Sequence, residues 1–473
     1  MPQNSAQFIN IPINKGTIPD WNTRLGYSNL LNLFVGESGF LYSSPGLEAI
    51  PSSEGIQLSD IRQIHYTRFL GGTYIVITST AVYRVLPSGG VVSQVGVIEN
   101  SGLPVQVDEN IDEQIGIVDG RSMYVYIQKT GVFEQLTEAD NEFLVKKPIS
   151  ITILNNIAIV LDGETDGWYI SSPNNMLDWP VLDFVPSIDS SLTKAVGLET
   201  LNNNLYIFGS TGIERWEPVY NTSPYLFPFA KDNNFRTDFG ALSTNGIMRG
   251  ATKSLSRIYF LSSQFVPMAL TSQGISQLPD DKNMTGMAKI ISEYEDVNTS
   301  FCCVVSVRGH YLVYFSFPSK NLSWVFCENS DAWAQFDEVI VSSLPTQEVL
   351  ATKDNIFNAL PTVIPDVTKH RRFQSERFTA YKGTAPYRGL ISGIECRMVQ
   401  GQRQSQTTQQ LELTLSIDSE SWLNTVTRPL PRVGKRNGIV VWQMNLAAYE
   451  YTIRLDYYGD MDITIEKVIA TIQ

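Results

Sequence analysis

The chain has 473 residues, of which 43% are apolar and 18% charged, a balance typical of a globular protein with a sizeable core. Its net charge of −13 argues against a protein that grips DNA, which needs a basic surface to displace counterions, although an acidic surface can let DNA slide past. The first residues lack the features of a secretory signal and no apolar run reaches membrane-spanning length, so we expect folding in a reducing cytoplasm. The cysteines have no disulfide or zinc-binding spacing, and we expect buried thiols at Cys302, Cys303, Cys327 and Cys396.

Residues 30–50 read LLNLFVGESGFLYSSPGLEAI, which predicts a strand, a turn, a second strand and a second turn. Residues 1–38 are expected to form an N-terminal arm. An unpaired strand edge invites aggregation, and nothing upstream except this polar arm can pair with the strand at 40–50. Its partner must therefore come from farther along the chain.

One hairpin pattern recurs through the first three quarters of the chain: an apolar strand, a short polar turn, and a second strand with an aromatic residue. The seven copies begin at Tyr74, Ile115, Ile157, Leu205, Ile258, Tyr311 and, more weakly, Val349. Their spacing of roughly 40 to 50 residues is typical of β-propeller blades. The first strand of each copy is almost wholly apolar, as expected for burial between neighbouring blades. The sequence therefore predicts an all-β protein with a β-propeller of about seven blades at residues 39–366, six remaining possible, and an ordinary β-sandwich as the alternative.

The last hairpin ends near Leu360 without an outer strand of its own, so we predict that the strand at 40–50 supplies one and closes the ring. From residue 367 a basic stretch and several turns precede longer alternating strands. Residues 367–473 are therefore predicted to be a linker followed by a C-terminal β-sandwich. Short helices are expected only at 137–147 and 285–294.

The sequence offers little chemistry. Its three histidines, His65, His310 and His370, have no metal-ligand spacing, and no phosphate-binding, nucleophile or dinucleotide motif is present, so we expect no catalytic residue, metal or cofactor. Acidic stretches at 162–168 (DGETDGW) and 279–282 (PDDK) could hold Ca²⁺ or a sugar, but acidic residues are also common in turns. The stretch 416–422 (SIDSESW) is expected to be a hairpin turn anchored by Trp422.

Two basic clusters are the local charge anomalies. Each is either a solvated connecting segment or a docking patch for another subunit or an acidic partner. The first comprises Lys369, Arg371, Arg372 and Arg377, and the second comprises Arg432, Lys435 and Arg436.

Short motifs along nearly the whole chain are similar to those of one protein family. These are NLL and GFLYSSPGL near the N-terminus, AVGLETLNNNLYIFGSTGIERWEP from residue 195, GIMRGATKSLSRIYFLSS from residue 246, and RPLPRVGKRNGIVVWQMNLAAYEYTIRL from residue 428. In their order and spacing the chain resembles the tail-hub, or nozzle, proteins of short-tailed bacteriophages (podoviruses), also called packaged-DNA stabilisation proteins.

The resemblance implies a structural protein of the virion tail. Such proteins form a ring, typically a hexamer, below the portal and its adaptor. They extend the DNA channel without binding DNA specifically, help to retain the genome, and dock spikes, fibres or a needle. The alternative hypotheses are a propeller glycosidase or depolymerase that acts on host surface glycans, and a secreted carbohydrate-binding protein.

Overall fold

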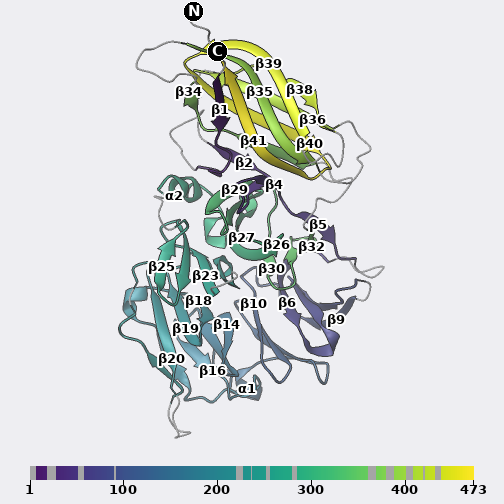
Figure 1. The fold of residues 1–473 in the computed structure, drawn as a ribbon. Helices are drawn as coiled ribbons and strands as arrows, with labels where there is room; N and C mark the ends of the chain where they lie inside the picture. The colour runs from purple at the N-terminus through teal and green to yellow at the C-terminus, as the bar shows by residue number, and fades with distance from the viewer. Residues whose placement is uncertain are drawn as a thin grey trace, which may run out of the picture.

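The computed structural model describes residues 7–18, 28–51, 58–89, 92–219, 227–235, 237–251, 256–279, 285–360, 369–379, 388–400, 409–418, 421–431 and 438–473. Within them the chain is almost entirely β-structure, with two short helices, α1 (Glu138–Asn141) and α2 (Thr285–Ser292). Neither helix is long and apolar enough to cross a membrane. Figure 1 shows a sandwich of long strands above a ring of smaller sheets.

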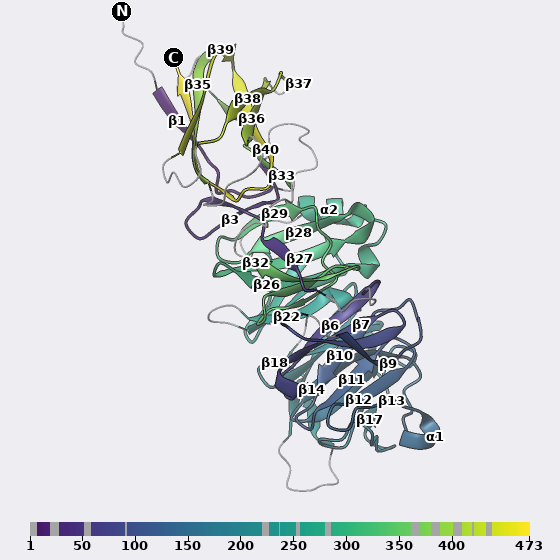
Figure 2. The same ribbon diagram turned by 90° about the vertical axis from the view of Figure 1, so that its right-hand side faces the viewer.

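The described residues of the lower part form seven four-stranded units around a ring, so this part is a seven-bladed β-propeller (Figures 1 and 2). Blades one to three consist of β6 (Ile61–Thr67), β7 (Thr73–Thr78), β8 (Ala81–Val85), β9 (Val92–Val97), β10 (Gln106–Glu109), β11 (Gln114–Val118), β12 (Met123–Ile127), β13 (Val132–Gln135), β14 (Pro148–Leu154), β15 (Ile157–Asp162), β16 (Trp168–Ile170) and β17 (Phe184–Val185). Blades four to six consist of β18 (Ala195–Leu201), β19 (Asn204–Gly209), β20 (Ile213–Pro218), β21 (Phe229–Lys231), β22 (Ile247–Ala251), β23 (Ser256–Leu261), β24 (Pro267–Thr271), β25 (Gly274–Gln277), β26 (Phe301–Val307), β27 (His310–Phe317), β28 (Leu322–Cys327) and β29 (Ala332–Phe336). Blade seven consists of β30 (Ser342–Leu344), β31 (Val349–Ala351), β32 (Ile356–Leu360) and β5 (Gly46–Ala49).

The seventh blade takes its fourth strand from the beginning of the chain. β5 pairs antiparallel with β32, so that Leu47 lies opposite Ala359 and Glu48 opposite Asn358. The innermost strand of this blade, β30, also contacts β6 of the first blade, which closes the ring. The preceding strand, β4 (Leu41–Ser43), joins the sandwich instead.

Apolar side chains fill the spaces between neighbouring blades. All six residues of β15 are buried. Its side chains alternate between two cores: Ile159 and Leu161 pack toward blade four, whereas Ala158 and Val160 pack toward blade two. A strand covered on both faces needs apolar residues at every position, which explains why the second strand of each blade was the clearest signal in the sequence.

The upper part is the C-terminal β-sandwich, and Figure 2 shows its two layers from the side. Its strands are β33 (Lys369–Gln374), β34 (Phe378–Thr379), β35 (Gly389–Gln400), β36 (Gln410–Ile417), β37 (Ser421–Trp422), β38 (Val426–Pro429), β39 (Gly438–Ala448), β40 (Glu450–Gly459) and β41 (Ile463–Ile472). One layer, here named the outer sheet, has the order β3-β4-β41-β35-β39, where β3 is Leu33–Val35, and β1 (Gln7–Ile11) also pairs with β41. The other layer contains β33, β40 and β36, with the short strands β34, β37 and β38 paired to them.

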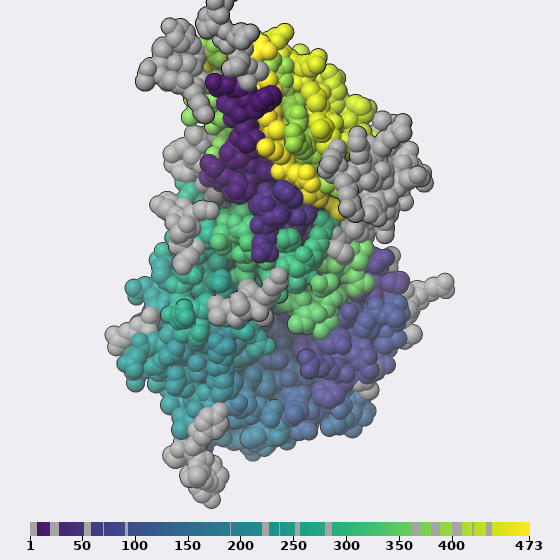
Figure 3. Space-filling view, in the orientation of Figure 1, coloured from purple at the N-terminus to yellow at the C-terminus, as the bar shows by residue number. Residues whose placement is uncertain are grey.

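The N-terminal segment joins the two parts of the molecule. Its strands are β1 (Gln7–Ile11), β2 (Asn29–Leu31), β3 (Leu33–Val35), β4 and β5. The first four belong to sheets that include the sandwich, and the fifth belongs to the propeller. Figure 3 shows the purple segment on the surface, passing from the sandwich down to the propeller. Residues 1–38 are therefore more than the arm that the sequence suggested, because three strands lie within them.

The two parts also share a sheet. The outermost strand of blade six, β29, is followed by β2 and then by β33 and β40, so that one eleven-stranded sheet, here named the junction sheet, runs from the propeller into the sandwich. Leu31 of β2 pairs parallel with Gln335 on one side and antiparallel with Arg372 on the other. Asn32 reinforces the joint: its amide donates to the His370 carbonyl at 2.7 Å, and its Oδ1 accepts from the Asp337 N–H at 3.1 Å. The basic stretch expected to be a linker is a strand of this sheet.

Candidate functional site

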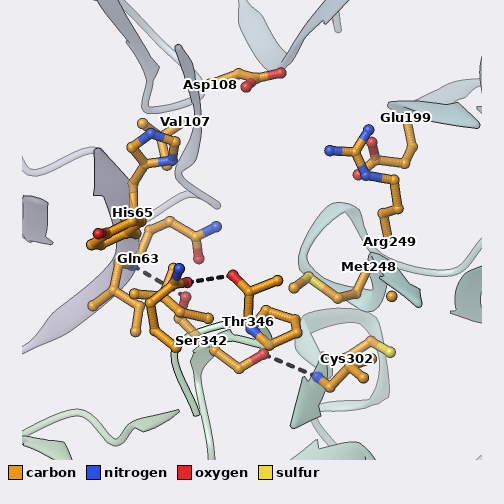
Figure 4. Close-up of a pocket in the computed structure, with 18 of the residues that line it drawn as sticks. Gln63, His65, Val107, Asp108, Glu199, Met248, Arg249, Cys302, Ser342 and Thr346 are labelled. Atoms are coloured by element: carbon orange, nitrogen blue, oxygen red, sulfur yellow. Dashed lines mark hydrogen bonds between the residues drawn. The ribbon is translucent and has the colours of Figure 1, made fainter. Parts of the chain in front are cut away.

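The first strands of the seven blades surround a cavity of about 770 Å³ at the centre of the propeller (Figure 4). His65 lines one side, Arg249 and Glu199 line the opposite side, and Asp108 lies at the top of the view. These charged groups come from four different blades. Apart from His65, which was considered only as a metal ligand, these residues were not predicted from the sequence, because each lies on a strand with mixed polarity rather than in a motif.

Two carboxylates of the cavity wall, Asp108 and Glu199, accept hydrogen bonds from backbone N–H groups, that of Glu199 coming from Thr200 at 2.8 Å. Asp108 accepts hydrogen bonds from the N–H groups of Glu109 and Ile153, both at 2.8 Å, and Ile153 belongs to the next blade. Burial raises the pKa of Asp108, although the charges of His65 and Arg249 act in the opposite direction. Burial likewise raises the pKa of Glu199, and the Arg249 charge again opposes it.

Serine side chains tie other neighbouring blades in the same way. Ser342 Oγ accepts from the Ile64 N–H at 3.1 Å, joining blades seven and one. Two similar bonds join blades six and seven, and blades three and four: Ser343 Oγ with the Val304 N–H, and Ser150 Oγ with the Leu198 N–H, each at 3.0 Å. Asp108, Ser342 and Ser343 of the cavity wall therefore satisfy buried backbone groups of neighbouring blades, which is a structural task.

The acidic stretch at 162–168 also has a structural task. The buried Asp162 accepts from the backbone N–H groups of Lys147 and Glu164 and from the Thr165 hydroxyl, each at 3.0 Å. This is the bonding of an acidic turn residue. Among the described residues no three His, Cys, Asp or Glu side chains are arranged to hold a metal ion. Residues 280–282 of the PDDK stretch lie outside the described residues.

The hairpin expected at 416–422 is present, since Ser416 pairs with Trp422 and Ile417 with Ser421. Arg454 lies over the Trp422 ring, 4.6 Å from its centroid. The aromatic ring therefore packs against the neighbouring strand and anchors the turn.

All four cysteines are buried thiols, as expected. Burial raises the pKa of Cys303 and of Cys396 to about 12, so that both remain protonated at neutral pH.

The first basic cluster lies where the propeller meets the sandwich, and its charges engage acidic groups of the same chain. Lys369 pairs with Glu338 just beyond blade six. Arg377 pairs with Glu450 at 3.1 Å. These acidic partners are distant in sequence, so they could not be predicted from the charges near the cluster. Contact of Lys369, Arg372 and Arg377 with a neighbouring subunit or the adaptor stays a prediction, and the second cluster, Arg432, Lys435 and Arg436, lies outside the described residues.

For Arg371 the expected surface contact is wrong, because its side chain is fully buried in this chain. Its Nη1 donates to the Gly459 carbonyl at 3.0 Å, and its guanidinium lies 5.5 Å from the centroid of the Tyr457 ring. Burial lowers the pKa of Arg371, against the charges of Tyr457 and nearby carboxylates. Strand alternation explains the burial, since Arg371 and Phe373 point inward while His370 and Arg372 point toward the surface.

Asp456 is the acidic centre of the junction. Its buried carboxylate accepts from His370 Nε2 at 2.7 Å, from Arg372 Nε at 2.7 Å and from Arg454 Nε at 2.8 Å. Burial opposes ionisation, but the hydrogen bonds from His370 and Arg372 and the charges of Arg372 and Arg454 outweigh it and lower the pKa of Asp456. The carboxylate therefore stays charged and holds β33 against β40.

This carboxylate should make stability depend on acid pH. The unfolded chain, with an aspartate pKa of about 3.9, takes up the proton before the folded chain does, so the stabilisation is complete above that value and is lost as pH falls through the lower folded pKa. We expect the melting temperature of the wild type to fall more steeply than that of Asp456→Asn between about pH 5 and pH 3, because the amide does not titrate. Thermal unfolding followed by circular dichroism at several pH values measures both slopes. Equal slopes would contradict the assignment.

Three of the solved structures that match this chain are similar to it only at a distance. The extracellular domain of a hybrid two-component system from B. thetaiotaomicron is 10% identical, with a TM-score of 0.42 over 74% of this chain and 43% of that one, so this chain spans less than half of that protein. A chain of the mitotic checkpoint complex is 10% identical, with a TM-score of 0.38 over 74% and 93% of the two chains. An exo-β-1,3-galactanase from Phanerochaete chrysosporium is also 10% identical, with a TM-score of 0.27 over 68% and 94%. At these values no functional argument follows.

No curated protein matches the sequence. The model of one protein family, described as bacteriophage P22 Gp10, β-propeller, matches residues 9–352. The match covers most of the chain and includes all of the first six blades. It agrees with the all-β propeller described above and with the resemblance to phage tail proteins. The chain therefore belongs to the bacteriophage P22 Gp10 family and is a structural protein of a phage tail.

Proposed function

We propose that this chain is the hub, or nozzle, subunit of a short phage tail. Six copies form a ring that extends the DNA channel below the portal and its adaptor protein. The ring helps to retain the packaged genome and docks spikes, fibres or a needle. Its subunits fold in the host cytoplasm and do not insert into membranes. Membership of the family supports the tail location.

The junction sheet is the observation that best supports this role. The propeller and the sandwich are joined through β29, β2 and β33, and one apolar core includes Tyr314 of blade six together with Trp442 of the sandwich. A hinge between the parts would break backbone hydrogen bonds and open this core, at a cost comparable to unfolding. A subunit without such a hinge suits a conduit that must hold against the pressure of a packaged genome.

The negative net charge of the chain suits a channel through which DNA passes rather than a surface that binds DNA. One chain carries −13, and six copies carry six times that charge. Wherever part of this charge faces a channel, it repels phosphate groups and keeps DNA from adhering to the wall. DNA then passes through the ring without a specific contact.

Ring formation tests the proposal directly. We expect the purified protein to have about six times the 52.9 kDa mass of one chain when it is measured by light scattering after gel filtration, and to appear as ring particles by negative-stain electron microscopy. The same sample mixed with DNA-filled, tail-less heads should add one ring to each portal vertex. Compact monomers at every concentration and salt, with no attachment to heads, would refute the proposed function.

A further inference from the structure

The outer sheet of the sandwich ends in two strands that have a partner on one side only among the described residues. β39 pairs with β35, and β1 pairs with β41. In the sheet order these two strands lie at opposite edges, separated by β35 and β41.

Both edges lack the usual protection against pairing with another chain. β39 has eleven residues, GIVVWQMNLAA, and β1 has five, QFINI, and neither contains a charged residue. Natural sheets protect their edges with charges, proline or very short strands, and a long uncharged edge attracts another strand. Although the chain carries −13, pairing of these two strands places no like charges directly opposite each other.

The same edges expose apolar side chains. Ile439 and Val441 of β39 are 51% and 47% exposed, while the alternating residues Val440 and Trp442 are buried in the core. Phe8 of β1 is 73% exposed. Because the inner face of the sheet is the core, all three exposed side chains lie on its outer face. When the two edges meet, these side chains come together on one surface.

Strand direction decides whether the edges of two copies can meet in a ring. From β39 to β35, from β35 to β41 and from β41 to β1, every pairing is antiparallel. Because the strand direction reverses at each of these three pairings, β1 runs antiparallel to β39. A neighbouring copy that is rotated about an axis roughly along the strands keeps its strand directions, so its β1 can continue the first copy's sheet as a further antiparallel strand.

We propose that β1 of each subunit pairs with β39 of its neighbour, so that the outer sheets join edge to edge around the ring. The contact is head to tail, as closure by rotation requires, and its partner is a second copy of this chain. The inference rests on the proposed ring and adds the segment that holds it together.

Disulfide trapping tests this contact. Within one chain, Phe8 and Val441 are separated by three interstrand spacings, about 14 Å, which exceeds the roughly 7 Å that a disulfide can bridge between Cα atoms. A disulfide between cysteines at these positions must therefore join two chains. The double variant Phe8→Cys/Val441→Cys should give, after mild oxidation, a ladder of up to six chains on a non-reducing gel, and pairings of Phe8→Cys with Ile439→Cys and Gln443→Cys determine the register. The matched control is Phe8→Cys/Val97→Cys, since Val97 is also exposed on an uncharged edge strand but lies in the propeller, and it should stay monomeric.

Charge at the edge gives an independent result. Ile439→Glu/Val441→Glu should raise the concentration needed for ring assembly by at least about tenfold, because two carboxylates would lose water against an uncharged strand, while Val97→Glu should leave it unchanged. Circular dichroism checks that all variants melt like the wild type. If the wild type forms rings but no cysteine pairing gives a ladder and the Glu variant assembles normally, the edge contact is refuted while the proposed function stands. If the wild type forms no rings in solution and adds none to DNA-filled, tail-less heads, both are refuted.

Discussion

Deletion of residues 1–50 should abolish cooperative folding of the whole chain. The deletion removes β5 from blade seven, β2 from the junction sheet, and β3 and β4 from the outer sheet. It also removes the fully buried side chains of Leu30, Leu33, Phe34 and Leu41. At about 1.5–3 kcal/mol for each buried side chain, the lost burial is on the order of 10 kcal/mol, comparable to the stability of a typical domain.

Two further samples make this experiment decisive. Deletion of residues 1–15 removes β1 alone among the described strands and should leave a single, somewhat lower melting transition. A peptide of residues 7–51, added to the chain that lacks residues 1–50, should restore the transition, because all the strands that it needs to pair with are present. A 1–50 deletion that melts like the intact protein would show that neither ring closure nor the junction depends on this segment.

Arg371→Glu should be the most damaging single substitution at the junction. The new carboxylate would be buried, would face the Gly459 carbonyl, and would lie near the charges of Asp462, Asp337 and Glu338. An unpaired buried charge costs roughly 3–5 kcal/mol or more, which is a large part of the stability of most domains. Urea unfolding should show a much lower midpoint, or no folded baseline.

Arg371→Met is the matched control, because it keeps the length and packing of the side chain while it removes the charge. In the described residues Nε and Nη2 of Arg371 have no hydrogen-bond partner, so the arginine recovers only part of the cost of its burial. We expect the methionine variant to lie within about 1–2 kcal/mol of the wild type. If Glu and Met have the same small effect, the site tolerates charge and the side chain is not enclosed as described.

The repeat in the sequence predicted the propeller because one strand of each blade is covered on both faces. Because β7 and β15 are buried on both faces, no charged or strongly polar residue lies in the middle of either strand. An apolar run of this kind can be recognised from the sequence alone. The innermost strands were not predicted. β10, with the sequence QVDE, faces the central cavity on one side and uses Asp108 to bind a backbone N–H of the next blade, so its composition resembles a loop.

The helix expected at 285–294 is present as α2, whereas the one expected at 137–147 is a single turn, α1. At α1 the Thr137 side chain accepts from the Asp140 N–H, and Glu142 adopts a left-handed conformation that ends the helix at once. The sequence indicated a favourable first turn. It did not indicate that the helix ends after one turn, at the left-handed Glu142.

The role of the basic stretch could not be predicted from charge alone. KHRRFQ has the composition of a solvated connecting segment, yet it pairs with β40 and meets Asp456, more than eighty residues away. The alternation of Arg371 and Phe373 toward one face was the available signal of a strand. Because arginine is rarely buried, the alternation did not lead to the prediction that Arg371 lies in the core.

The junction sheet and the early strands also determine when the protein can fold. Gln7 pairs with Ile472, and Gly46 with Leu360, so strands made first must wait for partners made last. At a synthesis rate of about 5–20 residues per second, the N-terminal strands stay unpaired on the ribosome for tens of seconds. Contacts of such long sequence separation slow folding and leave uncharged strands such as β1 exposed to other nascent chains. Production in the host should therefore depend on chaperones that cover the first fifty residues until translation ends.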